Sequence, residues 1–326
     1  MSTPDINFDK LSDSNLERVD DLQSIQSLKQ QEFTIKVLDE TTFSAQTICR
    51  LHHNYHLHPL MQLDSLEKLA ISLNTTGQCR FIDPDTEVSS PFNHKPRSPH
   101  KISVEEVFDR IEEPGSWIAL YDVQTDPTYR TFLRKAMNSV AHLIGDENEI
   151  SDVRGFIFIS APPSVTPFHI DRENNFWLQI KGQKKMSLWH HTDREIVAAK
   201  DIEQFIVYKS LDNVRLRDEM KARSVDFDCG PGDGVFFPST TPHATQSSTD
   251  WVTPGDGVTI SIGIVFYTKI TRLEAYVHAA NRLLRKLGLN PRDPGISDAA
   301  DSLKYFSGRI VVAIGRLRGY VPPPGF

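Results

Sequence analysis

A histidine and an aspartate two residues apart carry the clearest chemistry in this sequence of 326 residues. His169 and Asp171 stand in the stretch TPFHIDRENNFWLQIKGQKK, residues 166–185. On an extended strand, side chains at positions i and i+2 point to the same side of the sheet. An imidazole and a carboxylate on one side can therefore bind one divalent metal ion together.

A third ligand for such an ion has to come from a distant segment. His243 is the candidate, because it follows a Pro-Gly-Asp turn, a strand-like run and two prolines in CGPGDGVFFPSTTPHATQS. Two histidines and one carboxylate form a facial triad, which leaves positions open at iron for a bidentate co-substrate and O2. An HxD pair alone is common by chance, so the downstream histidine in a β-rich region is what favours the metal hypothesis.

A lysine and a threonine near the triad suit the far end of such a co-substrate. A dicarboxylate that chelates iron through its 2-oxo acid end leaves a second carboxylate, which needs a cation or strong donors. Lys184 lies 15 residues after His169 (184 − 169), on the expected return strand of a hairpin, QIKGQKKMSL, with Gly182 in its turn. Thr166, three residues before His169, can donate its hydroxyl to the same carboxylate.

The chain around these residues is rich in short strand-like runs, which predict a barrel or a sandwich from about residue 153 onward. These runs are RGFIFIS, NFWLQIKGQKKMSLWH, FIVYKS, DGVFFPS and GVTISIGIVFY. Further strands are expected over 33–40 and 116–123, and helices over 65–74, 103–115 (with Ser103 as N-cap), 128–145, 271–289 and 297–319. Residues 13–29 are expected to form a surface helix or an arm, and 85–101 an irregular loop.

The stretch TPFHIDRENNFWLQIKGQKK, together with FFPSTTPHA and GVTISIGIVFY, resembles the core of the JmjC (cupin-like) 2-oxoglutarate- and Fe(II)-dependent oxygenases. It is especially similar to the asparaginyl hydroxylase that inhibits the hypoxia-inducible factor, over roughly residues 115–268. The resemblance implies a fold that is mainly β with flanking helices, with a double-stranded β-helix (cupin or jelly-roll) core and a helical C-terminal extension. We expect a polar arm over 1–30, the oxygenase domain over 31–270 and the extension over 271–326.

The resemblance also implies roles for individual residues. His169, Asp171 and His243 would bind Fe(II), and Lys184 and Thr166 would hold the distal carboxylate of 2-oxoglutarate. Asn175 is expected as a donor near the co-substrate, and Tyr121 as the tyrosine that this family places on an earlier strand, although the strand register leaves Ala119 as an alternative. Gly263 departs from the family pattern, because the similar hydroxylase has an asparagine there.

The implied reaction consumes O2 and 2-oxoglutarate, releases succinate and CO2, and hydroxylates a protein, a peptide or a small molecule. Two other function classes remain open from the residues. One is a metal-binding cupin with non-oxidative chemistry, which has no need of Lys184. The other is a catalytically silent, JmjC-like binding or regulatory protein, against which an intact triad argues. Histone demethylation is less favoured, because no chromatin-reading module or zinc cluster accompanies the core.

Composition restricts the partners. The net charge of −7 argues against nucleic acid, and three separated cysteines fit reduced thiols. We expect a cytoplasmic protein, since neither a signal peptide nor a membrane-spanning run is readable. By analogy with the similar hydroxylase, the C-terminal helices are expected to form a homodimer. The apolar positions of 303–317 accordingly fit core or dimer surface, and the cluster His52, His53, His56 and His58 is interpreted as a solvated loop.

Overall fold

Two antiparallel sheets carry the core of this protein. The computed structural model describes residues 32–81, 103–145, 149–251 and 257–326. Thr34–Phe326 form one compact unit, which contains all the elements named here. The larger sheet has the order β1 (Ile35–Val37), β2 (Cys49–His53), β10 (Asp233–Phe237), β7 (Asn174–Lys181), β12 (Thr259–Tyr267), β5 (Ser151–Ser160), β4 (Trp117–Leu120), β3 (Cys79–Phe81). The smaller sheet has the order β6 (Ser164–His169), β11 (His243–Ser247), β8 (Lys184–Leu188), β9 (Val225–Cys229).

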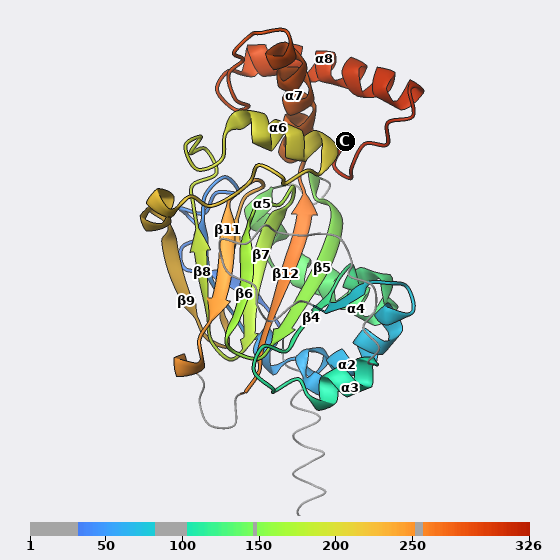
Figure 1. The fold of residues 1–326 in the computed structure, drawn as a ribbon, viewed down its shortest axis with the longest axis vertical. Helices are drawn as coiled ribbons and strands as arrows, with labels where there is room; N and C mark the ends of the chain where they lie inside the picture. Colours follow the sequence, from blue (N-terminus) through green and yellow to red (C-terminus); the bar gives the residue numbers. More distant parts are fainter. Residues whose placement is uncertain (1–31, 82–102, 146–148, 252–256) are drawn as a thin grey trace, which may run out of the picture. The chain divides into compact units, whose positions relative to one another are not determined.

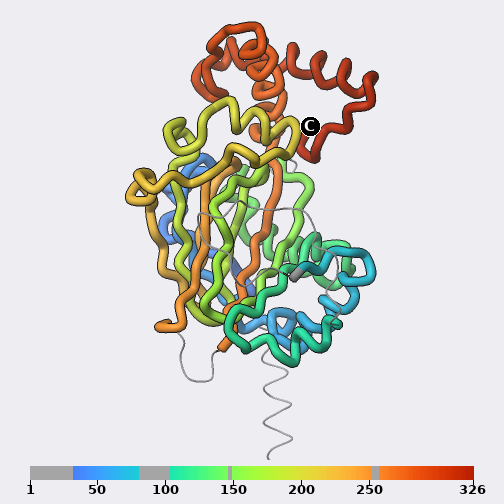
Figure 2. Tube along the Cα trace, in the orientation of Figure 1, coloured from blue at the N-terminus to red at the C-terminus, as the bar shows by residue number. Residues whose placement is uncertain are grey.

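The chain crosses between the two sheets repeatedly. From β5 onward the larger sheet takes β5, β7, β10 and β12, and the smaller sheet takes β6, β8, β9 and β11 (Figure 1). This winding is a double-stranded β-helix, so the predicted jelly-roll core is confirmed. Of the two expected architectures, the sandwich is the one observed. Strands β1 and β2 are distant in sequence from β10, yet β2 pairs directly with it (Figure 2).

Apolar side chains fill part of the space between the sheets. Trp177 on β7 and Phe237 on β10 pack against Met186 and Leu188 on β8. These residues alternate along their strands with side chains that face the other way, as burial of one strand face requires. Buried polar side chains share this interior, and His169, His243, Thr166 and Lys184 among them belong to the candidate site.

Helices flank the sheets. Short helices α2 (Leu63–Asn74), α3 (Val104–Asp109), α4 (Pro127–Asn138) and α5 (Ala141–Ile144) precede the core strands, and α6 (Ala199–Tyr208), α7 (Lys269–Lys286) and α8 (Asp298–Leu317) gather at one end of it (Figure 1). The 3-10 turns are η2 (Tyr55–Leu57), η3 (Pro59–Met61), η4 (Val123–Thr125), η6 (Asp218–Arg223) and η7 (Thr249–Trp251). Ser103 caps α3 through a reciprocal capping box with Glu106, as expected.

Three sequence expectations were wrong in part. FIVYKS is not a strand, because it completes α6, where Ile202, Phe205 and Ile206 pack into one apolar cluster at helical spacing. The expected helix over 128–145 is interrupted, since α4 ends at Asn138 and α5 starts at Ala141. The helix expected over 103–115 ends at Asp109.

The hairpin expected in QIKGQKKMSL was also wrong. Gly182 does form the turn, with a φ of +64° that favours glycine. However, β7 pairs with β10 and β12, whereas β8 pairs with β11 and β9, so the turn joins the two sheets. A turn residue predicts where the chain reverses but does not predict the sheet that the next strand enters.

The remaining expectations have mixed outcomes. The strands expected over 33–40 and 116–123 and the helices expected over 65–74, 271–289 and 297–319 are present. The arm or helix over 13–29 and the loop over 85–101 lie outside the described residues. The division into 1–30, 31–270 and 271–326 stays a prediction.

Candidate metal centre

The three predicted metal ligands lie together between the sheets. His169 ends β6, His243 begins β11, and these two residues are direct partners across the strand pair. Asp171 lies two residues after the end of β6, and its Oδ2 is 3.6 Å from Nε2 of His243. One ligand atom from each residue lies within 4.8 Å of the others. The neighbours Phe168 and Ile170 point the opposite way, into the apolar cluster under α6, so the strand alternation itself directs His169 and Asp171 inward.

Both imidazoles are oriented by the same backbone device. Nδ1 of His169 is 2.7 Å from the carbonyl oxygen of Pro167, and Nδ1 of His243 is 2.9 Å from that of Thr241. An Nδ1–H that donates to a carbonyl leaves Nε2 as a lone pair, which is the form that binds a metal. Both rings are buried, so this orientation is held by packing as well. The donor set therefore fits a divalent ion.

The two segments that supply the ligands are tied together. The amide of Thr240 donates to the carbonyl oxygen of Asp171 over 2.8 Å, and the amide of Ser239 donates to Oδ1 of Asn174 over 3.1 Å. Thr240 has a φ of +61°, a backbone conformation that a threonine rarely adopts. Strain of this kind persists where the surroundings impose it, and here it lies three residues before His243.

A bulge in β6 brings Thr166 onto the face of the metal ligands. His243 pairs with His169 and Thr245 pairs with Thr166, so between these pairs one residue of β11 lies opposite two residues of β6. Without this bulge, a residue three positions before His169 would point to the other face. The expectation that Thr166 and His169 serve one cavity thus has a structural basis that spacing alone did not provide.

Lys184 lies on the same inner face, deeper in the fold. Leu188 on β8 is the strand partner of His243, and Lys184 lies four residues before Leu188. Lys184 is therefore ~13 Å along the strand from the level of His243. Its side chain is 3% exposed, and burial lowers its pKa to about 8. Within the described part of the chain, no hydrogen bond or ion pair of its ammonium group is found. Lys184 is thus a buried cation that lacks a counter-charge from these residues.

Tyr121 reaches the site from the larger sheet. The register of β4 and β5 pairs Ala119 with Phe158, so the residues on one face are Trp117, Ala119 and Tyr121. The Tyr121 ring is 5.5 Å from Phe156, and Arg80 stacks 4.3 Å above it. Burial raises the pKa of Tyr121, and the nearby charge of Asp171 raises it further, which keeps the phenol neutral. Ala119 shares this face but lies deeper.

Asn175 and Gly263 face each other across β7 and β12. Asn175 is 5% exposed, and its Oδ1 has no hydrogen-bond partner among the described residues. A Cβ at Gly263 would be 3.1 Å from that oxygen. A side chain at position 263 would crowd Asn175, so the glycine leaves room for it.

Two features had no sequence signal or a misleading one. Arg80 lies against Tyr121 although the two residues are 41 positions apart (121 − 80), and nothing in their local sequence links them. The histidine cluster of 52–58 is not the solvated loop that was expected. His53 is buried and its Nε2 lies 3.0 Å from the carbonyl oxygen of Gln179, while burial lowers the pKa of both His53 and His58 to about 4.

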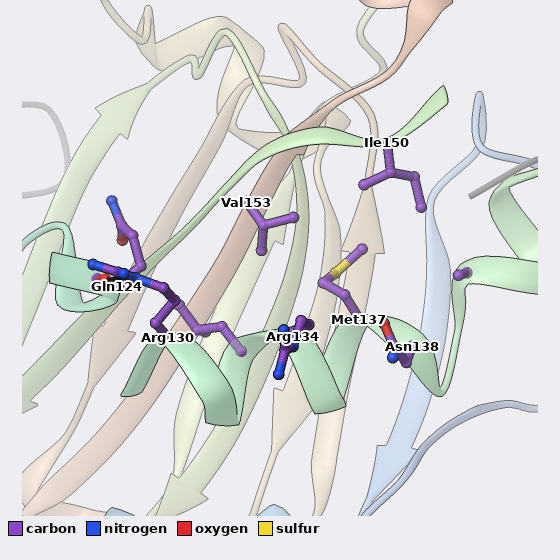
Figure 3. A pocket seen from close by; sticks show the side chains of 9 residues that line it. Gln124, Arg130, Arg134, Met137, Asn138, Ile150 and Val153 are labelled. Atoms are coloured by element: carbon purple, nitrogen blue, oxygen red, sulfur yellow. Dashed lines mark hydrogen bonds between the residues drawn. The ribbon is translucent and has the colours of Figure 1, made fainter. Parts of the chain in front are cut away.

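A separate cavity of about 330 Å³ lies between α4 and the beginning of β5 (Figure 3). It is lined by apolar side chains such as Met137 and Val153 and by the cations Arg130 and Arg134. None of the described residues that line it is a histidine, a cysteine or an acid, so it offers no ligand set for a divalent metal.

The fold and the triad define a metal-binding double-stranded β-helix protein. A family model for the JmjC domain matches residues 141–272, a stretch that contains all three candidate ligands. Residues 141–272 therefore form a JmjC domain, the domain of 2-oxoglutarate-dependent dioxygenases that use Fe(II), 2-oxoglutarate and O2, and the triad lies within it. The special likeness to the asparaginyl hydroxylase stays a prediction.

Solved structures give more distant likenesses. YcfD, described as a ribosomal oxygenase from Escherichia coli, is 15% identical, with a TM-score of 0.45 over 86% of this chain and 68% of that chain. Its complex with cobalt and 2-oxoglutarate is also 15% identical, with a TM-score of 0.44 over 86% of this chain and 68% of that chain. The DMSP lyase DddQ from Ruegeria pomeroyi is 16% identical, with a TM-score of 0.21 over 35% of this chain and 37% of that chain. These values carry no conclusion about activity, and no curated protein matches in sequence.

Among the described residues, no helix has the length and apolar character needed to cross a membrane.

Replacing Lys184 by methionine should stabilise the ligand-free protein. Because the folded pKa of about 8 is below the ordinary value of 10.5, the charged form costs stability at neutral pH, and wild-type stability should rise as the pH passes from 8 to 10.5. We expect Lys184→Met to gain about 1–3 kcal/mol at pH 7 in chemical denaturation, and the gap to narrow by pH 10.

The matched control is Lys185→Met, which removes a partly exposed lysine that pairs with Asp226. It should change stability little. A Lys184→Met protein less stable than the wild type at pH 7 would mean that a counter-charge already compensates the buried ammonium group.

Proposed function

We propose that this protein hydroxylates a C–H bond of a protein, peptide or small-molecule substrate, with conversion of 2-oxoglutarate to succinate and CO2. One atom of O2 goes to the product and the other to succinate, so the electrons balance without a further reductant. The observation that carries the proposal is the convergence of His169, Asp171 and His243 on one point above a buried lysine that has no counter-charge from the described residues. We assign Fe(II) binding to those three residues.

The interior residues would hold the co-substrate. A dianionic 2-oxo acid supplies the negative charge that Lys184 lacks, and a charge-assisted hydrogen bond to its ammonium group would offset the cost of burial. Thr166, on the same face, can donate its hydroxyl to the same carboxylate. The side-chain NH2 group of Asn175 can donate to the co-substrate, and its Oδ1 has no hydrogen-bond partner among the described residues. We assign to Tyr121 a neutral hydroxyl at the level of the metal.

The protein's own contribution is geometry and exclusion of water. When bound, Fe(II) supplies the redox chemistry with O2 that side chains cannot perform. The paired strands β6 and β11 fix the two imidazoles, and the Thr240 amide fixes the backbone of Asp171. The apolar residues Trp177 and Phe237 reduce access of water to the same interior.

The rival functions make different demands on these residues. A non-oxidative metal cupin would use the triad but has no requirement for a buried lysine at the depth of Lys184. A silent binding protein would need neither an oriented triad nor an uncompensated cation. The two features together favour the oxygenase. Variants of Asp171 and Lys184 distinguish it from a non-oxidative metal cupin and from a silent binding protein.

Asp171→Ala should abolish 2-oxoglutarate turnover. Loss of the only carboxylate of the triad should lower succinate formation under air by about 10³-fold or more, because two imidazoles alone hold the metal weakly. Asp228→Ala, which removes an exposed carboxylate on β9, should leave the rate unchanged. Equal rates for Asp171→Ala and wild type would exclude the triad as the reaction centre.

Lys184→Met should weaken binding of 2-oxoglutarate more than it weakens metal binding. In an anaerobic titration with Fe(II), the wild type should develop a weak visible charge-transfer band on addition of 2-oxoglutarate. The variant should need about 10²-fold more 2-oxoglutarate for half of this band, since a buried charge pair is lost. A band of unchanged affinity would show that the co-substrate is held elsewhere, and a complete lack of any band in the wild type would favour a rival class.

We also propose a homodimer through α8. Gly308 lies where a Cβ would be 1.9 Å from the carbonyl oxygen of Tyr276, so α8 packs closely on α7 by this face. The other face exposes an apolar stripe, which rules out core as its interpretation within one chain. This stripe comprises Leu303, Phe306, Ile310, Ile314 and Leu317. A continuous apolar stripe of this kind favours a protein contact.

Replacing Phe306 and Ile310 by glutamate should produce a monomer. Both side chains are 61% exposed in the single chain, so the change disturbs little of its own core. Sedimentation velocity should give a dimer for wild type and a monomer for the double variant, with Ser302→Glu on the same helix as control. A wild-type monomer at micromolar concentration would contradict the dimer and leave the oxygenase proposal intact.

A further inference from the structure

A cavity of about 410 Å³ lies between α7, the loop from β10 to β11 and the segment before α8. This volume suits a small organic group rather than a single ion. Ile270, Glu274 and His278 line it from α7, where spacing by four residues places them on one helix face. The cavity thus has two polar side chains next to an apolar one on a single rigid element.

Glu274 brings a carboxylate to this cavity. No hydrogen bond or ion pair of Glu274 is found within the described part of the chain. Burial and the nearby charge of Asp301 raise its pKa to about 7, although Arg194 opposes this shift. The guanidinium of Arg194 is itself paired with Asp293, so it is not a dedicated counter-ion for Glu274. A carboxylate kept from water in this way is costly unless a cation reaches it.

His278 is a second polar side chain that lines the same cavity. It is 7% exposed, and its Nδ1 has no hydrogen-bond partner among the described residues. Burial lowers the pKa of His278 to about 3, so the ring is neutral at physiological pH and can accept a hydrogen bond from a donor. An unpaired carboxylate and an unpaired imidazole four residues apart together suit a ligand that is rich in N–H groups.

Part of the lining suits an aliphatic stem, and the other lining residues are mostly polar and include Arg194, whose guanidinium is paired with Asp293. Ile270 and Ile296 face the cavity together with Pro294. Lysine and arginine side chains combine an alkyl stem with a charged head, and they bury the stem along apolar surfaces. A metal ion would instead need three or more converging ligand atoms, and Glu274 is in no such group of the described residues.

We propose that this cavity binds the ammonium or guanidinium group of a basic side chain on the primary substrate, with Glu274 as its counter-ion and His278 as a hydrogen-bond acceptor. The role as a substrate subsite rests on the proposed oxygenase function, whereas the binding of the cation does not. Glu274 and His278 are specificity-determining residues in this proposal, since neither is in the triad.

The cavity lies next to the candidate metal centre. Thr240 and Asn174 line it, and the amide of Thr240 donates to the carbonyl oxygen of Asp171 over 2.8 Å. A side chain bound here contacts the strained Thr240 backbone, one hydrogen bond from a metal ligand. A residue anchored by its basic group could thus present a neighbouring part of the substrate to the metal.

The test measures cation binding without turnover. Nα-acetyl-arginine methylamide and Nα-acetyl-lysine methylamide are titrated into the full chain and followed by NMR or calorimetry, with the citrulline and norleucine analogues as neutral counterparts. At pH 8 we expect each cation to bind at least tenfold more tightly than its neutral analogue. Glu274→Gln should remove this preference, whereas Glu195→Gln, which alters an exposed carboxylate outside the cavity, should preserve it.

The pH dependence gives a second readout in the unmodified protein. Between pH 8 and pH 6, Glu274 takes up a proton, so affinity for the arginine compound should fall several-fold. Burial holds the pKa of His191 at about 4 and that of His278 at about 3, so both stay neutral over this range. The facing carboxylates of Asp293 and Asp301 are already held by an ion pair and a hydrogen bond.

Each outcome decides one part of the proposal. Equal affinities for arginine and citrulline compounds, or equal losses in Glu274→Gln and Glu195→Gln, would overturn the cation site even if the enzyme forms succinate. Cation binding that depends on Glu274 in a protein without 2-oxoglutarate turnover would keep the site and overturn its role as a substrate subsite.

Discussion

The pairing of β6 with β11 is the constraint on which the site depends. It sets His169 opposite His243, and the hydrogen bond from the Thr240 amide to Asp171 fixes the third ligand against the same strand end. The bulge in that pair adds Thr166 to the ligand face. A one-residue slip of register would turn every one of these side chains away, so the chemistry depends on the backbone ladder as much as on the residues.

A second theme is the cost of polar groups that the structure retains. Lys184 is buried and Glu274 is half-buried, and neither ionisable side chain has a counter-charge dedicated to it within the described residues. Stability alone would disfavour both. Such groups are typical of places where a ligand completes the charge balance. In the proposals above, 2-oxoglutarate supplies the counter-charge for Lys184, and a basic side chain of the substrate supplies the counter-charge for Glu274.

The sequence predicted the jelly-roll core, the helical extension and the convergence of the triad, because strand alternation and ligand chemistry are local or strongly patterned. It did not predict that Gly182 joins two sheets, or that FIVYKS is helical, because pairing partners and tertiary packing decide both. Tyr121 could be placed only by strand register. The cavity position of Glu274 could not be predicted from its neighbours in sequence, because the cavity is formed by segments that are distant in sequence.

The central claim is that one divalent ion binds His169, Asp171 and His243 with open positions facing Lys184. A crystal structure of the protein loaded anaerobically with Mn(II) and 2-oxoglutarate tests it most directly. We predict one ion bonded to both Nε2 atoms and to the Asp171 carboxylate, with the far carboxylate of 2-oxoglutarate on the Lys184 ammonium group. An ion bound elsewhere, or a co-substrate that does not reach Lys184, would contradict the account.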